Sequence, residues 1–150
     1  MSSVANMRTF YIFKIKTEYS KLTKDLPDNL YYTFLKMRLS QHYNLAYVTN
    51  QYQSIIANLN RDDLSHQLSQ QLNDSDGYMI YRYTHMYNNY YSDEVSKLTI
   101  YRSFLILKSN KPNSTFFTLL YQIPHLFVID FENKDYFWLG QMDNLRLVNP

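Results

Sequence analysis

A single stretch near the C-terminal end, residues 115–139, limits the possible folds most strongly. It opens with apolar residues at the spacing of one helical face: Phe116, Leu119, Leu120 and Ile123. Pro124 lacks the amide hydrogen that a continuing helix needs, so the helix should end before it. Residues 126–131 are then nearly all apolar, which is typical of a strand covered on both faces. After a polar turn, residues 136–139 predict a second, aromatic strand.

The rest of the chain must supply the other strands and helices of an α/β sandwich. Strands are expected over residues 9–16, 78–87 and 98–107, because apolar and β-favouring residues dominate there. Between the first two, apolar residues at helical spacing predict three helices, one after Asp28, one over residues 44–58 and one after Asp62. Residues 17–26 should form a polar loop or helical turn.

This order of elements sets the expected fold class. It is strand, three helices, two strands, helix and two strands. We therefore predict a single-domain α/β sandwich, with a mixed β-sheet of about five strands and helices on both faces. No repeat or linker divides the 150 residues, so we place one domain at residues 8–150, after a disordered tail at residues 1–7.

Composition indicates where such a protein would work. The chain has no cysteine, which rules out disulfides and thiolate metal sites and suits a reducing cytoplasm. No apolar run approaches the ~20 residues of a spanning helix, and no secretion signal stands near the N-terminus. We expect a cytoplasmic protein with no membrane partner.

The residue patterns that most enzymes depend on are missing. Gly77 and Gly140 stand alone, so no glycine-rich loop is available to cradle a phosphate. The four histidines lack the paired spacing of a zinc site. Asp130, near His125, closes a buried strand as some catalytic carboxylates do, but it can equally accept amide hydrogens in the following turn while His125 caps the strand entrance. We expect no enzyme, no catalytic residues, no cofactor and no metal.

Tyrosine is unusually abundant. The chain has sixteen tyrosines and nine phenylalanines against two glycines. Tyrosine has an apolar body and a polar tip, so a tyrosine-rich surface is suited to protein contacts. The same bias would arise from AT-rich codons, which also favour the many Asn, Lys and Ile residues.

Some of these tyrosines alternate with basic residues in the expected strands. Arg82, Lys97 and Arg102 would give such a sheet the charge and the aromatic rings needed to bind single-stranded nucleic acid. Alternatively, the arginines lie near strand ends and pair with acidic residues. The net charge of +2 is too small to indicate nucleic acid by itself.

One pattern connects the C-terminal elements with a known family. Two aromatics open a short helix, a buried strand ends in Asp-Phe, and aromatic-x-Trp-Leu follows a polar turn. These positions are Phe116, Phe117, Asp130, Phe131, Asn133, Lys134, Tyr136, Trp138 and Leu139. With the strand and loop at residues 10–19, the pattern resembles the sporulation inhibitor of replication (SirA) family. The resemblance implies a bacterial negative regulator of replication initiation that binds the N-terminal domain of the initiator DnaA, without direct DNA contact.

The resemblance also implies which residues bind DnaA. In the family, aromatic side chains one helical turn apart follow the first strand, and a later helix supplies a glutamine. Carried across, the first aromatic is Tyr19, and the glutamine is Gln53, with Gln51 as the alternative. The second aromatic position is Thr23, a departure for which Leu22 could compensate if the turn is helical.

The residues around Tyr19 allow two interpretations without the family. Tyr19 follows a strand whose end becomes polar, beside Lys16, Lys21 and Lys24. Its ring is either offered outward to a partner with an acidic rim or packed between helix and sheet. The two functions that remain open are a DnaA-binding regulator and, alternatively, a single-stranded nucleic-acid-binding protein.

Overall fold

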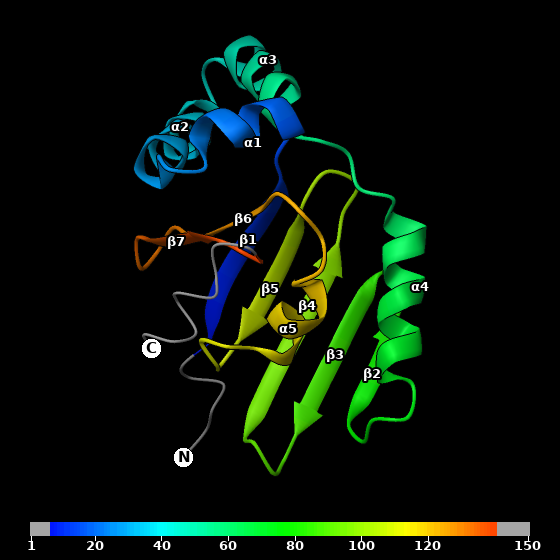
Figure 1. Cartoon of the computed structure of the whole chain (residues 1–150). Helices are drawn as coiled ribbons and strands as arrows, with labels where there is room; N and C mark the ends of the chain where they lie inside the picture. Colours follow the sequence, from blue (N-terminus) through cyan, green and yellow to red (C-terminus); the bar gives the residue numbers. More distant parts are fainter. Residues whose placement is uncertain (1–6, 141–150) are drawn as a thin grey trace.

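Five helices and one sheet make up the part of the chain that the computed structural model describes, residues 7–140 (Figure 1). The expected tail at residues 1–7 lies outside this range, except for Met7. In chain order the elements are β1 (Arg8–Lys14), α1 (Thr17–Thr23), α2 (Pro27–Ser40), α3 (Leu45–Ile55), α4 (Arg61–Leu72), β2 (Tyr78–Tyr81), β3 (Thr84–Asn89), β4 (Glu94–Ile100), β5 (Leu105–Ser109), α5 (Thr115–Leu120), β6 (Leu126–Asp130) and β7 (Asp135–Trp138).

The sheet differs from the prediction in strand number and direction. Its seven strands have the order β2-β3-β4-β5-β1-β6-β7, and all six neighbouring pairs are antiparallel, so it is not mixed. The strand expected over residues 78–87 is a hairpin, β2 and β3, that turns at Arg82 with a φ of 55°. The strand expected over residues 98–107 contains the turn between β4 and β5, where the Tyr101 amide donates to the Phe104 carbonyl at 2.9 Å. In both places the chain turns back where one long strand was predicted. Each turn therefore adds a strand to the sheet and makes the two neighbouring strands antiparallel.

Two hydrophobic clusters use alternate residues of the central strands, which point to opposite sides of a sheet. Phe10 and Ile12 of β1 belong to the first cluster, together with side chains of α4 and α5. Phe13 and Ile15 belong to the second cluster, together with side chains of α2 and Ile55 of α3. Figure 1 shows α1, α2 and α3 gathered at one end of the molecule, and α4 alongside β2 and β3.

The helices begin at residues that satisfy their first free amides. Pro27 is the first residue of α2, where no amide hydrogen is needed. The side chains of Asn44, Asn60 and Ser114 accept hydrogen bonds at the starts of α3, α4 and α5. Residues 17–26, expected as a loop or helical turn, contain α1.

A buried histidine joins α4 to the outer part of the sheet. His85 of β3 is fully buried, with Nε2 2.9 Å from the Ser65 hydroxyl and Nδ1 2.7 Å from the Tyr78 hydroxyl. Burial disfavours the charged ring and lowers the pKa of His85 from 6.5 to about 4. The histidine is therefore a neutral structural group at neutral pH.

This burial predicts a pH-dependent loss of stability. As the pH falls from 6.5 to about 4, the unfolded chain binds a proton at His85 that the folded chain does not, so the free energy of unfolding should fall. The contribution of His85 to this slope is at most about 1.4 kcal/mol per pH unit. Urea unfolding across this range should show a shallower slope for His85→Gln, whose side chain keeps polar contacts but does not titrate. Equal slopes for the two proteins would contradict the prediction.

Candidate protein-binding site

The segment that follows β1 is held against the end of α3. The Lys16 amide donates to the Ile55 carbonyl at 2.8 Å, and the Ala57 amide donates to the Lys14 carbonyl at 2.7 Å. The Lys16 ammonium group also donates to the carbonyl oxygen of Gln53. These contacts fix the start of α1 beside the last turn of α3.

A second contact holds α1 to the entrance of β6. Ser20 is buried, and its hydroxyl lies 2.8 Å from Nδ1 of His125. The His125 carbonyl accepts a hydrogen bond from the Ile15 amide at 2.8 Å. His125 therefore lies at the entrance of β6, where the sequence analysis placed it as the alternative to a catalytic role. With Ser20 directed inward, the residues on the other side of α1 face solvent.

The structure brings three of the four predicted binding residues onto α1. Tyr19 is half-buried and packs against the second cluster, whereas Leu22 is 75% exposed. The half-buried Thr23 donates its hydroxyl hydrogen to the Tyr19 carbonyl at 2.8 Å, so its polar end is satisfied within α1. Gln53 is exposed near the end of α3, where Lys16 contacts its backbone, and Gln51 is half-buried. Tyr19 is therefore partly packed between helix and sheet and partly exposed to a partner, so each of the two interpretations applies in part.

The surface around Leu22 combines apolar and basic side chains. Leu26 is 48% exposed just beyond α1. Lys16, Lys21 and Lys24 are all exposed, and the nearby acidic residues Glu18 and Asp25 are exposed as well. An exposed leucine pair with a basic rim suits a protein partner with acidic residues around its contact.

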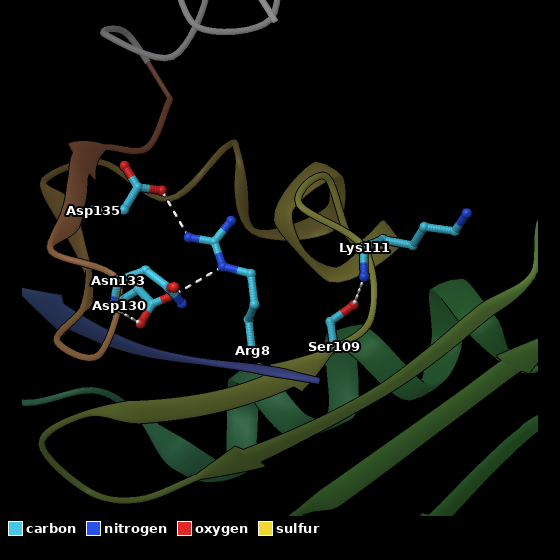
Figure 2. A network of polar contacts seen from close by, with 6 residues as sticks. All are labelled: Arg8, Ser109, Lys111, Asp130, Asn133 and Asp135. Carbon is cyan, nitrogen blue, oxygen red and sulfur yellow. Dashed lines mark hydrogen bonds and ion pairs between the residues drawn. The ribbon is translucent and has the colours of Figure 1, made fainter. Parts of the chain in front are cut away.

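Asp130 has a structural role that accounts for its position at the end of β6. Figure 2 shows Arg8 between two carboxylates, with Nε donating to Asp130 at 2.8 Å and an Nη donating to Asp135 at 2.9 Å. The Asn133 backbone and side-chain amides donate to Asp130 at 3.1 and 2.7 Å. Burial raises the pKa of Asp130, but the hydrogen bonds from Asn133 and Arg8 outweigh it and leave the pKa below its ordinary value. The Asp130 carboxylate thus accepts amide hydrogens from the turn that follows β6, which the sequence analysis gave as the alternative to a catalytic role.

The residues expected to stack nucleic-acid bases do not gather on one face. Arg82 and Arg102 lie in the turns of the two hairpins, at strand ends. Tyr78 and Tyr87 pack against the first cluster, on the side of the sheet that faces α4. Lys97 points to the opposite side, because its neighbour Leu98 belongs to that cluster.

Sequence reasoning missed an aromatic pocket between the sheet and the helices α2 and α3. The pocket has a volume of about 190 Å³, and its walls include Tyr11, Phe34 and Tyr52, with Arg38 and Gln41 as polar residues. Its residues come from five separate parts of the chain, so no local motif marks it. The one available signal was Arg38, a charge one turn beyond Phe34 on an otherwise apolar stripe of α2.

The described residues also bear on membrane and metal binding. Within residues 7–140, no helix has the length and apolar character needed to cross a bilayer. In the same range, no three His, Asp or Glu side chains gather as metal ligands would.

Two comparisons with known proteins bear on the family. Residues 8–143 match the model of a family described as sporulation inhibitor of replication protein SirA. This range covers most of the chain and all of the elements from β1 to β7. No individual curated protein matches the chain.

Proposed function

Because the chain belongs to the family of the sporulation inhibitor of replication protein SirA, we propose that it restrains replication initiation by binding the N-terminal domain of DnaA. The family name describes an inhibitor of replication linked to sporulation. In our proposal the protein works in the cytoplasm through protein contact alone, without catalysis and without touching DNA.

The observation that carries this proposal is the exposed apolar side of α1. Leu22 projects into solvent from a short helix that is fixed at its start by Lys16 and through Ser20. A partner binding there would not need to order a loop, so little conformational entropy would oppose association. Tyr19 supports the same surface, because an aromatic ring held at its base by the core is a pre-organised anchor.

We expect Tyr19→Ala to weaken binding of the DnaA N-terminal domain by about 2 kcal/mol, or roughly 30-fold, because it removes an anchor side chain. Gln53→Ala should weaken binding by about 1 kcal/mol, the contribution of one hydrogen bond at an interface rim. Isothermal titration calorimetry with the purified domain measures both changes.

Packing and binding must be separated in this experiment. Because Tyr19 packs partly on the second cluster, Tyr19→Ala should also lower the melting temperature. Leu22→Ser should weaken binding without that loss, since Leu22 is 75% exposed. Leu39→Ser is the matched control, because Leu39 is 63% exposed on α2, outside the proposed site.

Two outcomes would contradict the proposal at different levels. If wild-type protein does not bind the DnaA domain, the proposed function is wrong. If it binds, but Tyr19→Ala and Leu22→Ser bind equally well, then DnaA contacts another surface and the site is wrong.

A further inference from the structure

One side of the outer sheet carries a row of side chains that no described helix covers. Met79, Met86, Lys97, Lys108 and Thr9 are successive register partners across β2, β3, β4, β5 and β1, so they share one side. The second cluster, on this side, contains no residue of β2, β3 or β4. Met79, Lys97 and Lys108 are exposed.

The charges in this row are unbalanced. Lys97 and Lys108 lie directly opposite each other on β4 and β5, where like charges repel. Among residues 7–140, neither lysine forms an ion pair. Glu94 is the acidic residue of strands β1 to β5, and it points to the other side, where it bonds α5. A cross-strand pair of lysines that forms no ion pair within residues 7–140 attracts an anionic partner.

The aromatic pocket adjoins this surface. Tyr11 lines the pocket and is the register partner of Ile106, which lies two residues from Lys108 on the same side of β5. Two residues along a strand span about 7 Å, so Lys108 is within reach of a peptide seated in the pocket. Arg38 lies at this pocket, with its guanidinium carbon 5.4 Å from the ring centre of Tyr11 and 4.7 Å from that of Phe131.

We infer that the pocket and the Lys97–Lys108 pair form a second binding surface, for an acidic peptide segment of a partner protein that anchors one apolar side chain in the pocket. The volume of about 190 Å³ suits a single large side chain better than a drug-sized ligand, whose sites are usually above about 300 Å³. Carboxylates flanking the anchor would meet Arg38 on one side and the lysine pair on the other. The pocket takes no residue from α1, which carries the main part of the DnaA site proposed above, although Val48 and Tyr52 in its wall belong to α3, the helix of Gln53.

A protein segment fits this surface better than a nucleic acid. Stacking of bases needs exposed aromatic rings beside the basic residues. In the row with Lys97 and Lys108 the neighbours are methionine and threonine, and Tyr11 is half-buried in the pocket beneath Arg38. Methionine side chains are common on surfaces that bind peptides, because they adapt to different apolar partners.

The probe for this surface is a short fluorescein-labelled peptide with one leucine flanked by aspartates and glutamates. Its fluorescence anisotropy should rise saturably with the full-length protein. The double variant Lys97→Ala/Lys108→Ala should bind about tenfold more weakly. Arg38→Ala should also bind more weakly, and a peptide with serine in place of leucine should lose most of its affinity. The matched control is Lys21→Ala/Lys24→Ala, which removes the same charge from the α1 region and should leave peptide binding unchanged.

A second variant distinguishes a loss of peptide binding from a loss of folding. Lys108→Glu places opposite charges across the pair, so it should preserve the melting temperature while weakening peptide binding. Three results would overturn the inference: no saturation up to about 1 mM peptide, equal losses in the α1 control, or no effect of replacing the leucine. The same test should be made with a labelled single-stranded oligonucleotide. If the oligonucleotide binds through Lys97 and Lys108 and the peptide does not, the surface binds nucleic acid and the inference is wrong. Because the readout uses no DnaA, these results are independent of the proposed function.

Discussion

Replacing Trp138 with alanine is expected to lower the free energy of unfolding by about 3 to 5 kcal/mol. Trp138 is 3% exposed in the second cluster, and its ring meets Phe127 edge to face with centroids 5.0 Å apart. Alanine would leave a cavity between β6, β7 and α2, because these elements hold the surrounding side chains in place. Urea unfolding monitored by circular dichroism measures the loss.

Trp138→Phe is the informative control for this prediction. The indole Nε1 is buried and has no hydrogen-bond partner among residues 7–140. Phenylalanine keeps the aromatic contact and removes the unpaired donor, whose burial costs about 1 to 3 kcal/mol. We therefore expect Trp138→Phe to stay within about 1 kcal/mol of the wild type. Equal losses for the two variants would show that the ring contact with Phe127 contributes little.

The second large effect concerns Glu94, a buried carboxylate that joins β4 to the start of α5. It is 5% exposed and accepts hydrogen bonds from the Ser96 and Ser114 hydroxyls at 2.5 and 2.9 Å. The Thr115 amide and hydroxyl also donate to it, at 2.9 and 2.7 Å. Glu94→Ala removes the acceptor of all four hydrogen bonds. The Ser96 hydroxyl still lies within hydrogen-bond distance of Ser109 and Ser114, but the Thr115 amide and hydroxyl lose their acceptor, so the free energy of unfolding should fall by about 3 kcal/mol.

Glu94→Gln tests whether the hydrogen bonds carry this effect. The amide oxygen can take the place of Oε2, which accepts three hydrogen bonds, and the amide nitrogen can donate to the Thr115 hydroxyl in place of Oε1. Glutamine should therefore lose less stability than alanine in the same urea experiment. A wild-type stability for Glu94→Ala would show that α5 docks without this network.

The sequence predicted helices and strands well where the local pattern of residues was compatible with one kind of element. Residues 115–139 form α5, β6 and β7 in the expected order, with α5 ending at Leu120, before Pro124. The hairpins were missed because their turns lack the residues that mark turns. Arg82 adopts a positive φ that usually favours glycine or asparagine, in the turn that the pairing of β2 with β3 closes.

The candidate site was predictable in position but not in exposure. The exit of the chain from β1 follows from the change to polar residues after Ile15, and the expected turn became α1. The half-burial of Tyr19 depends on how α1 packs on the second cluster, and the contact of Lys16 with Gln53 joins residues that are 37 positions apart. Such contacts arise from tertiary packing, which no local pattern in this sequence encodes.

The place of β1 in the sheet has a consequence for how the protein is made. The first strand of the chain lies between β5 and β6, and Arg8 pairs with Ser109 while Tyr11 pairs with Ile129. On the ribosome, β1 must therefore wait until residue 109 has emerged before it can pair with β5, and until residue 130 before it can pair with β6. During this wait the β2 to β5 meander can form by itself, whereas the helices α1 to α3 lack the β6 and β7 surface on which they pack. Synthesis thus completes the sheet late, when β6 and β7 emerge, and closing so long a loop between β1 and β6 should make that step slow.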